Sequence, residues 1–436
     1  MSLVLVGWLA VTILLMKLVA SLAHASIIVG DSLHSVTMHF LTLLPLLATS
    51  ASALAFPGAE GFGSNAVGGR NGTVYVVTNL NDSGPGSLRD AVSQPNRIVV
   101  FSTGGLITIK ERMVVSKRVS ILGQTAPGDG ITVYGNGWSF SNANDAIVRY
   151  LRIRMGKTGT SGKDAITISE GSNMILDHVS VSWGRDETFS ISGPDVGNIT
   201  IQNSIIAQGL QTHSCGGLLQ TELGSGISVL RNLYIDNKTR NPKVKGTNDF
   251  TNNVVYNWGG GGAYIAGDSE APSEANIVGN YFVAGPSSGS VAPFTRGNAL
   301  FKGFVQGNFF DSDLNGKLDG KEIAVQSKDY GGMNIQPERF KYPAPGKVMA
   351  AGDALAFVAK SAGASRVRDG VDERLVAELS SFGKMGELVS DEGAGPGVIS
   401  KGTQWVDGNG NGIPDDVEAQ FTDVEAWANS LVPSTY

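Results

Sequence analysis

The sequence has only one cysteine, Cys215, in 436 residues, so an intrachain disulfide is impossible. An exported protein without disulfides must be held together by core packing or by metal ions. Charged residues are scarce at 17%, and 33 basic residues against 39 acidic ones give a net charge of -6. This balance provides no general attraction for nucleic acid, so an anionic partner must meet a local basic patch.

Glycine and apolar residues are abundant instead. With 58 glycines and 42% hydrophobic residues, the composition predicts many tight turns around a substantial core rather than a helical protein. From about residue 147 to residue 310 one pattern of apolar, polar, Asn and apolar positions recurs. Its copies read IVRYLRIR, MILDHVSV, ITIQNSII, SVLRNLYI, FTNNVVYN, NIVGNYFV and FVQGNFFD.

These repeats predict stacked turns of short strands. The last five copies place Asn203, Asn232, Asn253, Asn280 and Asn308 at intervals of roughly 20 to 30 residues, the range of solenoid repeats. We therefore expect an all-β fold, a parallel β-helix over residues 56–322, with these asparagines stacked in a ladder at a bend. The alternative is an antiparallel sandwich, although hairpin dipeptides do not recur at sandwich spacing.

The sequence changes character after Phe310. Helical spacing appears in residues 353–364, 372–382 and 417–431. In the last of these, one face carries Val417, Phe421, Val424, Trp427 and Leu431. We expect residues 323–436 to form a partly helical C-terminal extension that packs on the β-helix as part of one domain, in a monomeric protein.

The amino end has two apolar runs. Residues 3–23, interrupted by Lys17, are long enough to cross a bilayer, and a shorter run over residues 40–47 precedes small residues. The second run predicts a signal peptide over residues 38–55, and therefore a secreted protein with no stable membrane association after processing. Residues 1–37 are then an upstream gene-model artefact or a membrane anchor. Export also agrees with four glycosylation sequons, at Asn71, Asn81, Asn198 and Asn237.

Two twelve-residue stretches match the calcium-loop pattern of oxygen ligands around a central glycine. The first, DSDLNGKLDGKE, offers Asp311, Asp313, Asn315, Asp319 and Glu322. The second, DGNGNGIPDDVE, offers Asp407, Asn409, Asn411, Asp415 and Glu418. We expect structural Ca²⁺ in both loops, and the alternative is an Asn/Gly turn with solvated acids.

The middle of the chain carries a further set of acidic residues. Asp164 lies about one turn of the expected solenoid before the adjacent Asp186 and Glu187, so stacking would gather their carboxylates into a cation site. Asp177 and His178 lie in the same stretch, where hydrogen bonding within the coil explains a polar pair equally well.

The segment DNKTRNPKVKG, residues 236–246, is the best candidate for a local basic patch. Its cations are Lys238, Arg240, Lys243 and Lys245. In a chain of net negative charge, these four residues are where an anionic partner would be met.

Five segments occur in order from Phe56 nearly to the carboxyl end. They are FPGAEGFGSNAVGGRNGTVYVVTNLNDSGPGSLRDAV, ILDHVSVSWGRDETFS, TRNPKVKG, SAGASRVRDGVDERLVAEL and DGNGNGIPDDVE. Together they resemble the pectate lyases of polysaccharide lyase family 1. The resemblance implies a right-handed parallel β-helix that cleaves de-esterified polygalacturonate, the pectate of plant cell walls, by β-elimination to 4,5-unsaturated oligogalacturonides, with Ca²⁺ bridging enzyme and uronate.

The resemblance also implies roles for single residues. The family's Arg-x-Pro-x-x-Arg motif corresponds to Arg240 through Lys245, which makes both catalytic candidates and places Arg240 at the proton-abstracting position. Lys238 and Lys243 would contact polymer carboxylates. Because the free pKa of arginine exceeds about 12, a second role stays open, in which Arg240 stabilises the enolate and solvent takes the proton.

The sequence departs from the family pattern at three places. Lys245 stands for the second arginine, which keeps the charge but loses bidentate binding of carboxylate. Ser190 stands where the family's calcium cluster often has a second aspartate, leaving Glu187 as the substitute. His213 and Cys215 occupy a segment in which many members carry a lysine, so His213 is a candidate substrate contact.

Other functions remain open at this point. A lyase preferring methylated pectin is the nearest, although an esterified substrate has no carboxylate for calcium to bridge. A non-catalytic β-helix that binds acidic glycan is a second. A glycoside hydrolase would need a close acid pair. We expect Asp186 and Glu187 to be adjacent on one strand and to point to opposite faces, which does not make such a pair.

Overall fold

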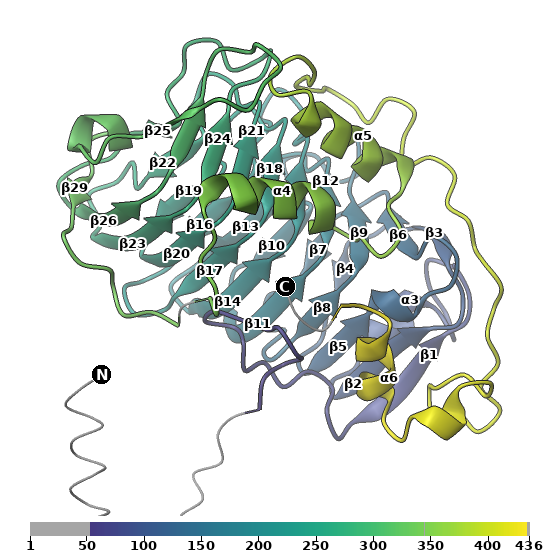
Figure 1. Ribbon diagram of the computed structural model, residues 1–436. Helices are drawn as coiled ribbons and strands as arrows, with labels where there is room; N and C mark the ends of the chain where they lie inside the picture. The colour runs from purple at the N-terminus through teal and green to yellow at the C-terminus, as the bar shows by residue number, and fades with distance from the viewer. Residues whose placement is uncertain (1–52, 344, 434–436) are drawn as a thin grey trace, which may run out of the picture. The chain divides into compact units, whose positions relative to one another are not determined.

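The strands of the chain form three long sheets, which Figure 1 shows stacked turn upon turn. The computed structural model describes residues 53–343 and 345–433. Sheet A contains β1 (Thr73–Val77), β2 (Arg97–Phe101), β5 (Val119–Leu122), β8 (Ile147–Arg149), β11 (Gly171–Asp177), β14 (Val196–Gln202), β17 (Ile227–Leu230), β20 (Thr247–Thr251), β23 (Ser273–Val278), β26 (Phe301–Gln306) and β29 (Asn334–Ile335).

The other two sheets follow the same order along the stack. Sheet B contains β3 (Gly105–Thr108), β6 (Ile131–Tyr134), β9 (Leu151–Arg154), β12 (Ser180–Ser182), β15 (Ile205–Ala207), β18 (Leu233–Ile235), β21 (Val254–Tyr256), β24 (Tyr281–Val283), β27 (Phe309–Asp311) and β28 (Lys321–Glu322). Sheet C contains β4 (Met113–Val114), β7 (Trp138–Ser139), β10 (Ile166–Ile168), β13 (Phe189–Ser192), β16 (Leu218–Gln220), β19 (Lys243–Lys245), β22 (Tyr264–Ala266) and β25 (Phe294–Thr295).

Strand pairing identifies the architecture. Neighbours in a sheet, such as β8, β11 and β14, are three strands apart in the chain and run parallel, so each turn contributes one strand to each sheet. Among the described strands, the one antiparallel pair is β27 with β28. The parallel β-helix is therefore confirmed, and the antiparallel sandwich is excluded.

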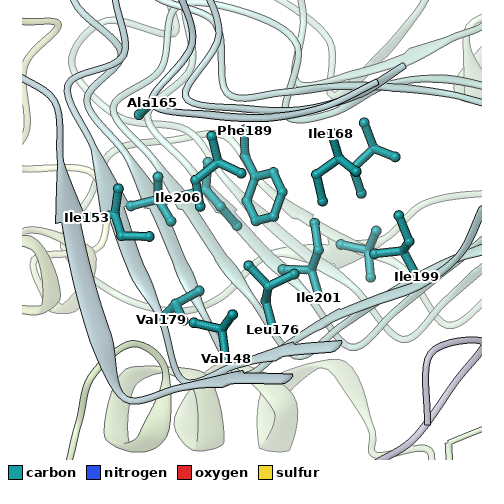
Figure 2. Close-up of a cluster of buried hydrophobic side chains, with 14 of the residues drawn as sticks. Val148, Ile153, Ala165, Ile168, Leu176, Val179, Phe189, Ile199, Ile201 and Ile206 are labelled. Atoms are coloured by element: carbon teal, nitrogen blue, oxygen red, sulfur yellow. The ribbon is translucent and has the colours of Figure 1, made fainter. Parts of the chain in front are cut away.

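The core lies inside the three sheets. Figure 2 shows Val148, Leu176 and Ile201 of sheet A facing side chains of the other two sheets, among them Phe189 and Ile206. These side chains are at most 1% exposed. Stacked branched residues bury a continuous apolar interior, which meets the requirement that a chain without disulfides be held by packing.

The bends between sheets A and B repeat a backbone conformation and an asparagine ladder. From β8 to β26, a residue with positive φ follows each sheet A strand, for example His178 (φ 53°) and Asn252 (φ 58°). The next position forms the ladder: the Asn232 backbone N–H donates to Asn253 Oδ1 at 2.9 Å, and Asn253 N–H to Asn280 Oδ1 at 2.8 Å. The ladder continues to Asn308 and is thus confirmed.

One member of the predicted ladder was wrong. Asn203 has a φ of 51° and occupies the bend position, where its side chain donates to Asp177 Oδ1 at 2.9 Å. Ser204 takes the ladder position and accepts from the Val179 backbone N–H at 3.2 Å. The copy ITIQNSII is therefore shifted by one residue relative to the copies that follow it.

The short helix α3 (Leu88–Val92) follows β1, and two longer helices cover sheet B, as Figure 1 shows. α4 (Ala351–Ser361) and α5 (Gly370–Ser380) bury Leu355 and Leu375 against the outer faces of sheet B strands. Beneath α5, Arg154 Nη2 contacts Asp369 at 2.9 Å and Asp372 at 3.0 Å, and all three side chains are buried. The two predicted helices thus form; both pack on sheet B through apolar side chains, and α5 is also attached by buried ion pairs.

The third predicted helix is broken. The chain forms a short 3₁₀ turn, η4 (Glu418–Gln420), becomes extended at Phe421, and restarts as α6 (Val424–Ser430). Asp423 causes the restart, because its side chain accepts from the Glu425 and Ala426 backbone N–H groups as an N-cap. The predicted apolar residues nevertheless all join one cluster against β1 and β2.

Two elements of the β-helix lie beyond the boundary expected at residue 322. The last strand paired to sheet A, β29, and the 3₁₀ turn η3 (Ser327–Tyr330) both lie after residue 322, and η2 (Gly123–Thr125) follows β5. Residues 1–37 and nearly all of the expected signal peptide over 38–55 lie outside the described residues. Within the described part, no helix has the length and apolar character needed to span a membrane.

Candidate active site

The candidate site lies where successive turns pass from sheet B to sheet C. Glu187, Cys215 and Thr239 form parallel bridges on three consecutive turns, and Arg240 follows directly. Asp164 lies one turn before Glu187, whose backbone N–H donates to Asp164 Oδ1 at 3.1 Å. Solenoid stacking therefore aligns residues that are more than twenty positions apart in the chain.

Three acids meet here as expected. One carboxylate oxygen from each of Asp164, Asp186 and Glu187, hereafter the acidic group, lies within 4.8 Å of the others. Glu187 is 4% exposed, and burial together with Asp186 and Asp164 raises its pKa to about 7 even though Arg240 lowers it. Oxygen ligands gathered at this distance suit a hard divalent cation.

The closest cation to the acidic group is Arg240. Its Nη1 contacts Glu187 Oε1 in an ion pair. Burial lowers the pKa of Arg240, but Cys215, Glu187 and Asp186 together outweigh burial, so the pKa lies above its ordinary value. Like other arginines, Arg240 is a cation at ordinary pH.

The three lysines of the basic patch have different surroundings. Lys243 and Lys245 flank the buried Val244 on β19, so both project from the outer face of sheet C. Lys243 Nζ contacts Asp268 at 3.2 Å, which partly neutralises it. Lys245 lies beside Gln220 of the neighbouring strand. Lys238 Nζ donates to the Thr212 carbonyl at 3.4 Å.

His213 joins the acidic group from the next turn. Its Nε2 lies 2.9 Å from Asp186 Oδ1, and its side chain is 48% exposed. Cys215, two residues later, is buried, and burial raises the pKa of its thiol to about 12. The predicted position of His213 beside a substrate is thus compatible with its exposure.

The remaining acidic residues of this stretch differ in their surroundings. Asp177 and His178 do not join the acidic group; Arg149 Nε contacts Asp177 at 2.8 Å inside the coil, as the structural interpretation allowed. The prediction that Asp186 and Glu187 point to opposite faces of one strand was wrong. They lie in the bend before β13, where strand alternation does not apply, and their carboxylates converge.

The sequence interpretation missed two supporting residues. Thr167 Oγ1 donates to Asp164 Oδ2 at 2.7 Å and so orients that carboxylate. The backbone carbonyl of Val389, in the C-terminal extension, accepts from the Gln211 backbone N–H at 2.9 Å, two residues before His213. The three-residue spacing between Asp164 and Thr167 was a usable signal, whereas no local pattern indicated Val389.

The first calcium loop gathers most of its expected ligands. Carboxylate oxygens of Asp311, Asp313 and Asp319 lie within 4.8 Å of one another. Asn315 donates its amide nitrogen to Asp319 Oδ2 at 3.0 Å. Glu322 lies on β28 and is exposed, outside that group of three.

The second calcium loop is closed by its own hydrogen bonds. Asp407 Oδ1 accepts from the Gly410 backbone N–H and Asp415 Oδ1 from that of Gly408, both at 2.8 Å. The side chains of Asn409 and Asn411 donate to Glu418 Oε1. A cation here would require both asparagines to turn their oxygens inward.

The chain is similar to known proteins over nearly its whole length, although no family model matches it. It is 62% identical over 419 residues to "Probable pectate lyase C" of Aspergillus flavus, covering 92% of this chain and 99% of that protein. With a protein of the same name from Aspergillus fumigatus it shares 64% identity over 416 residues, 91% of this chain and 98% of that one.

Solved structures show the same fold. A Bacillus subtilis pectate lyase covers 74% of this chain and 100% of its own, with 13% identity and a TM-score of 0.51. The thermostable pectate lyase PL 47 covers 72% of this chain and 98% of its own, with 15% identity and a TM-score of 0.50.

The fold and these relatives define a polysaccharide lyase built on a parallel β-helix. Within that class, the chain belongs to the pectate lyase family, as its identity to the Aspergillus proteins shows.

Proposed function

We propose that the protein is a secreted, calcium-dependent lyase that cleaves de-esterified polygalacturonate by β-elimination, leaving 4,5-unsaturated oligogalacturonides. The observation that carries this proposal is the contact between Glu187 of the acidic group and Arg240, which lies two turns further along the solenoid. Carboxylates that can hold a hard cation lie beside a protonated guanidinium. Elimination next to a substrate carboxylate requires both groups, because each stabilises the negative charge that develops there.

Asp164, Asp186 and Glu187 would hold the calcium ion. When bound, this ion would supply a bridge to the uronate carboxylate and withdraw charge from it. Three converging carboxylate oxygens support the fit of a calcium ion. Ser190 stands where the family often has a second aspartate, and Glu187 would supply the missing carboxylate. Ser190 lies on β13 opposite Thr167 of β10, and a hydroxyl there supplies no negative charge.

Arg240 and Lys245 would act on the substrate. Transfer of the C5 proton to a solvent water leaves a carbanion that delocalises into the adjacent carboxylate. The C4–O bond then breaks, its electron pair leaves on the oxygen, and that oxygen takes a proton from solvent. Because Arg240 carries its proton in the free site, its proposed role is to stabilise the developing enolate charge, with Lys245 as the second cation. Base action by Arg240 would require the bound cation to lower that pKa.

The test is ultraviolet absorbance of unsaturated product on polygalacturonate, with calcium and with a chelator. We expect product only with calcium, and a loss of about 100-fold or more in turnover for Arg240→Ala. Arg70→Ala is the matched control, since Arg70 also contacts a carboxylate, Glu425, and its side chain is 26% exposed against 28% for Arg240.

Other outcomes would redirect the assignment. Full turnover in Arg240→Ala, with a native circular dichroism spectrum, would refute the role given to that residue. Reducing ends without absorbance would indicate a hydrolase, and binding without cleavage an acidic-glycan receptor. Faster cleavage of methylated pectin than of polygalacturonate would overturn the substrate preference.

A further inference from the structure

A second set of ligand atoms overlaps the acidic group. One oxygen of Glu187, one ring nitrogen of His213 and the sulfur of Cys215 all lie within 4.8 Å of one another. Glu187 and Cys215 form a parallel bridge on adjacent turns, so the backbone of the solenoid fixes their separation. A small closing movement of side chains brings three such atoms around one ion.

The chemistry of this set differs from that of the acidic group. Asp164, Asp186 and Glu187 offer oxygen alone, which suits calcium. Thiolate, imidazole and a single carboxylate are the ligands that Zn²⁺, Cd²⁺ and Co²⁺ take, in tetrahedral sites that leave one position for water.

Burial and access also fit a bound ion. Cys215 is 1% and Glu187 4% exposed, so two of the three ligands are shielded from water. The side chain of His213 is 48% exposed and would be the ligand on the solvent side. Its contact with Asp186 Oδ1 at 2.9 Å is of the kind that orients a metal-binding imidazole.

We propose that Glu187, His213 and Cys215 form a site for a thiophilic divalent cation of the Zn²⁺ class, overlapping the acidic group through Glu187. On binding, the metal–sulfur bond forms as the Cys215 Sγ–H bond breaks and its proton passes to solvent, with no change of oxidation state. Glu187 turns from Arg240 to the metal, so calcium at the acidic group and the thiophilic cation exclude each other. This last consequence rests on the proposed function, but the site itself does not.

The test is titration of the purified protein with Co²⁺, whose bond to thiolate gives a charge-transfer band in the near ultraviolet. Because Cys215 is the sole cysteine of the chain, a thiolate band can come from no other residue. We expect a band that saturates at one Co²⁺ per chain and is displaced by Zn²⁺. It should vanish in Cys215→Ser, and Co²⁺ should bind about 100-fold more weakly to His213→Gln.

Two controls separate this site from the acidic group. Asp164→Asn removes a ligand of the acidic group alone, so the thiolate band should persist while the calcium needed for lyase activity rises. His213→Gln alters an exposed side chain and keeps the test valid if Cys215→Ser does not fold.

The outcomes are distinct. A band without any lyase activity would support the metal site and refute the proposed function. Absence of a thiolate band in the wild-type protein, or tight binding that His213→Gln leaves unchanged, would overturn the site.

Discussion

Glu187 gives the protein a stability that depends on pH. Burial and the charges of Asp186 and Asp164 raise its pKa from 4.5 to about 7, against the opposing effect of Arg240. That difference corresponds to roughly 3 kcal/mol between the protonated and ionised forms. The folded state holds this proton more tightly than the unfolded chain does. The contribution is therefore fully present below about pH 4.5 and is lost as pH rises through about 7.

The variant that isolates this effect is Glu187→Gln. In chelator, the free energy of unfolding of the wild type should fall between about pH 5 and about pH 8.5 by roughly 3 kcal/mol more than that of the variant. Denaturant unfolding followed by circular dichroism measures both values. Asp236, whose pKa is also raised by burial, is present in both proteins, so its contribution cancels in the comparison.

The same unfolding measurements are repeated with calcium in place of the chelator. An ion held by the acidic group compensates the ionised carboxylate, so the wild-type loss at high pH should largely disappear in calcium. His213 and Cys215, which also face Glu187, are unchanged in the variant. Equal losses of stability in wild type and Glu187→Gln would refute the reasoning, as would a loss that calcium leaves unaltered.

Two further predictions concern the scaffold. Asn253→Ala should lower the free energy of unfolding by about 2 to 4 kcal/mol, because the buried Asn232 N–H loses its acceptor; a cost below about 1 kcal/mol in denaturant unfolding would contradict the ladder. Asp372→Ala should cost about 3 to 5 kcal/mol, since it leaves Arg154 and Arg152 with one buried carboxylate. Proteolysis should then cut first around α5, and unchanged protection there would argue against the ion pairs as its attachment.

The repeat made the fold predictable, since an apolar alternation with an asparagine at each turn has few architectures that bury it. Its register was less predictable. Asn203 and Asn232 occupy similar places in the sequence pattern, yet one closes a bend and the other belongs to the ladder. Asparagine suits both positions. At the bend it tolerates positive φ, and in the ladder its side-chain amide donates and accepts hydrogen bonds.

The C-terminal helix shows a second limit of periodicity. Residues 417–431 place apolar side chains at helical spacing, and those side chains do pack together. Spacing alone could not locate the break, because the extended segment around Phe421 also directs side chains to the cluster. The signal was Asp423, a residue type that begins helices more readily than it continues them.

The sequence predicted the contacts between residues about one turn apart. It did not predict contacts that depend on how several turns are offset from one another. Asp164 and Glu187 are about one turn apart, so their approach followed from stacking. The ion pair between Glu187 and Arg240 spans two turns and depends on how Cys215 is placed between them. That offset is a property of the assembled coil, and no window of sequence contains it.

These contacts make Glu187 the residue shared by the ion pair and both sets of ligand atoms. Arg240 pairs with Glu187 in the free protein. Glu187 is also one of the three oxygen ligands of the acidic group, and one of the three ligands proposed, with His213 and Cys215, for a thiophilic cation. Its carboxyl is buried and already pairs with Arg240. Under the proposed roles, a hard cation that draws Glu187 away would leave Arg240 free for a substrate carboxylate, whereas a thiophilic cation would draw it away without providing the bridge to that carboxylate. The identity of the bound ion would then decide whether releasing Arg240 leads to catalysis.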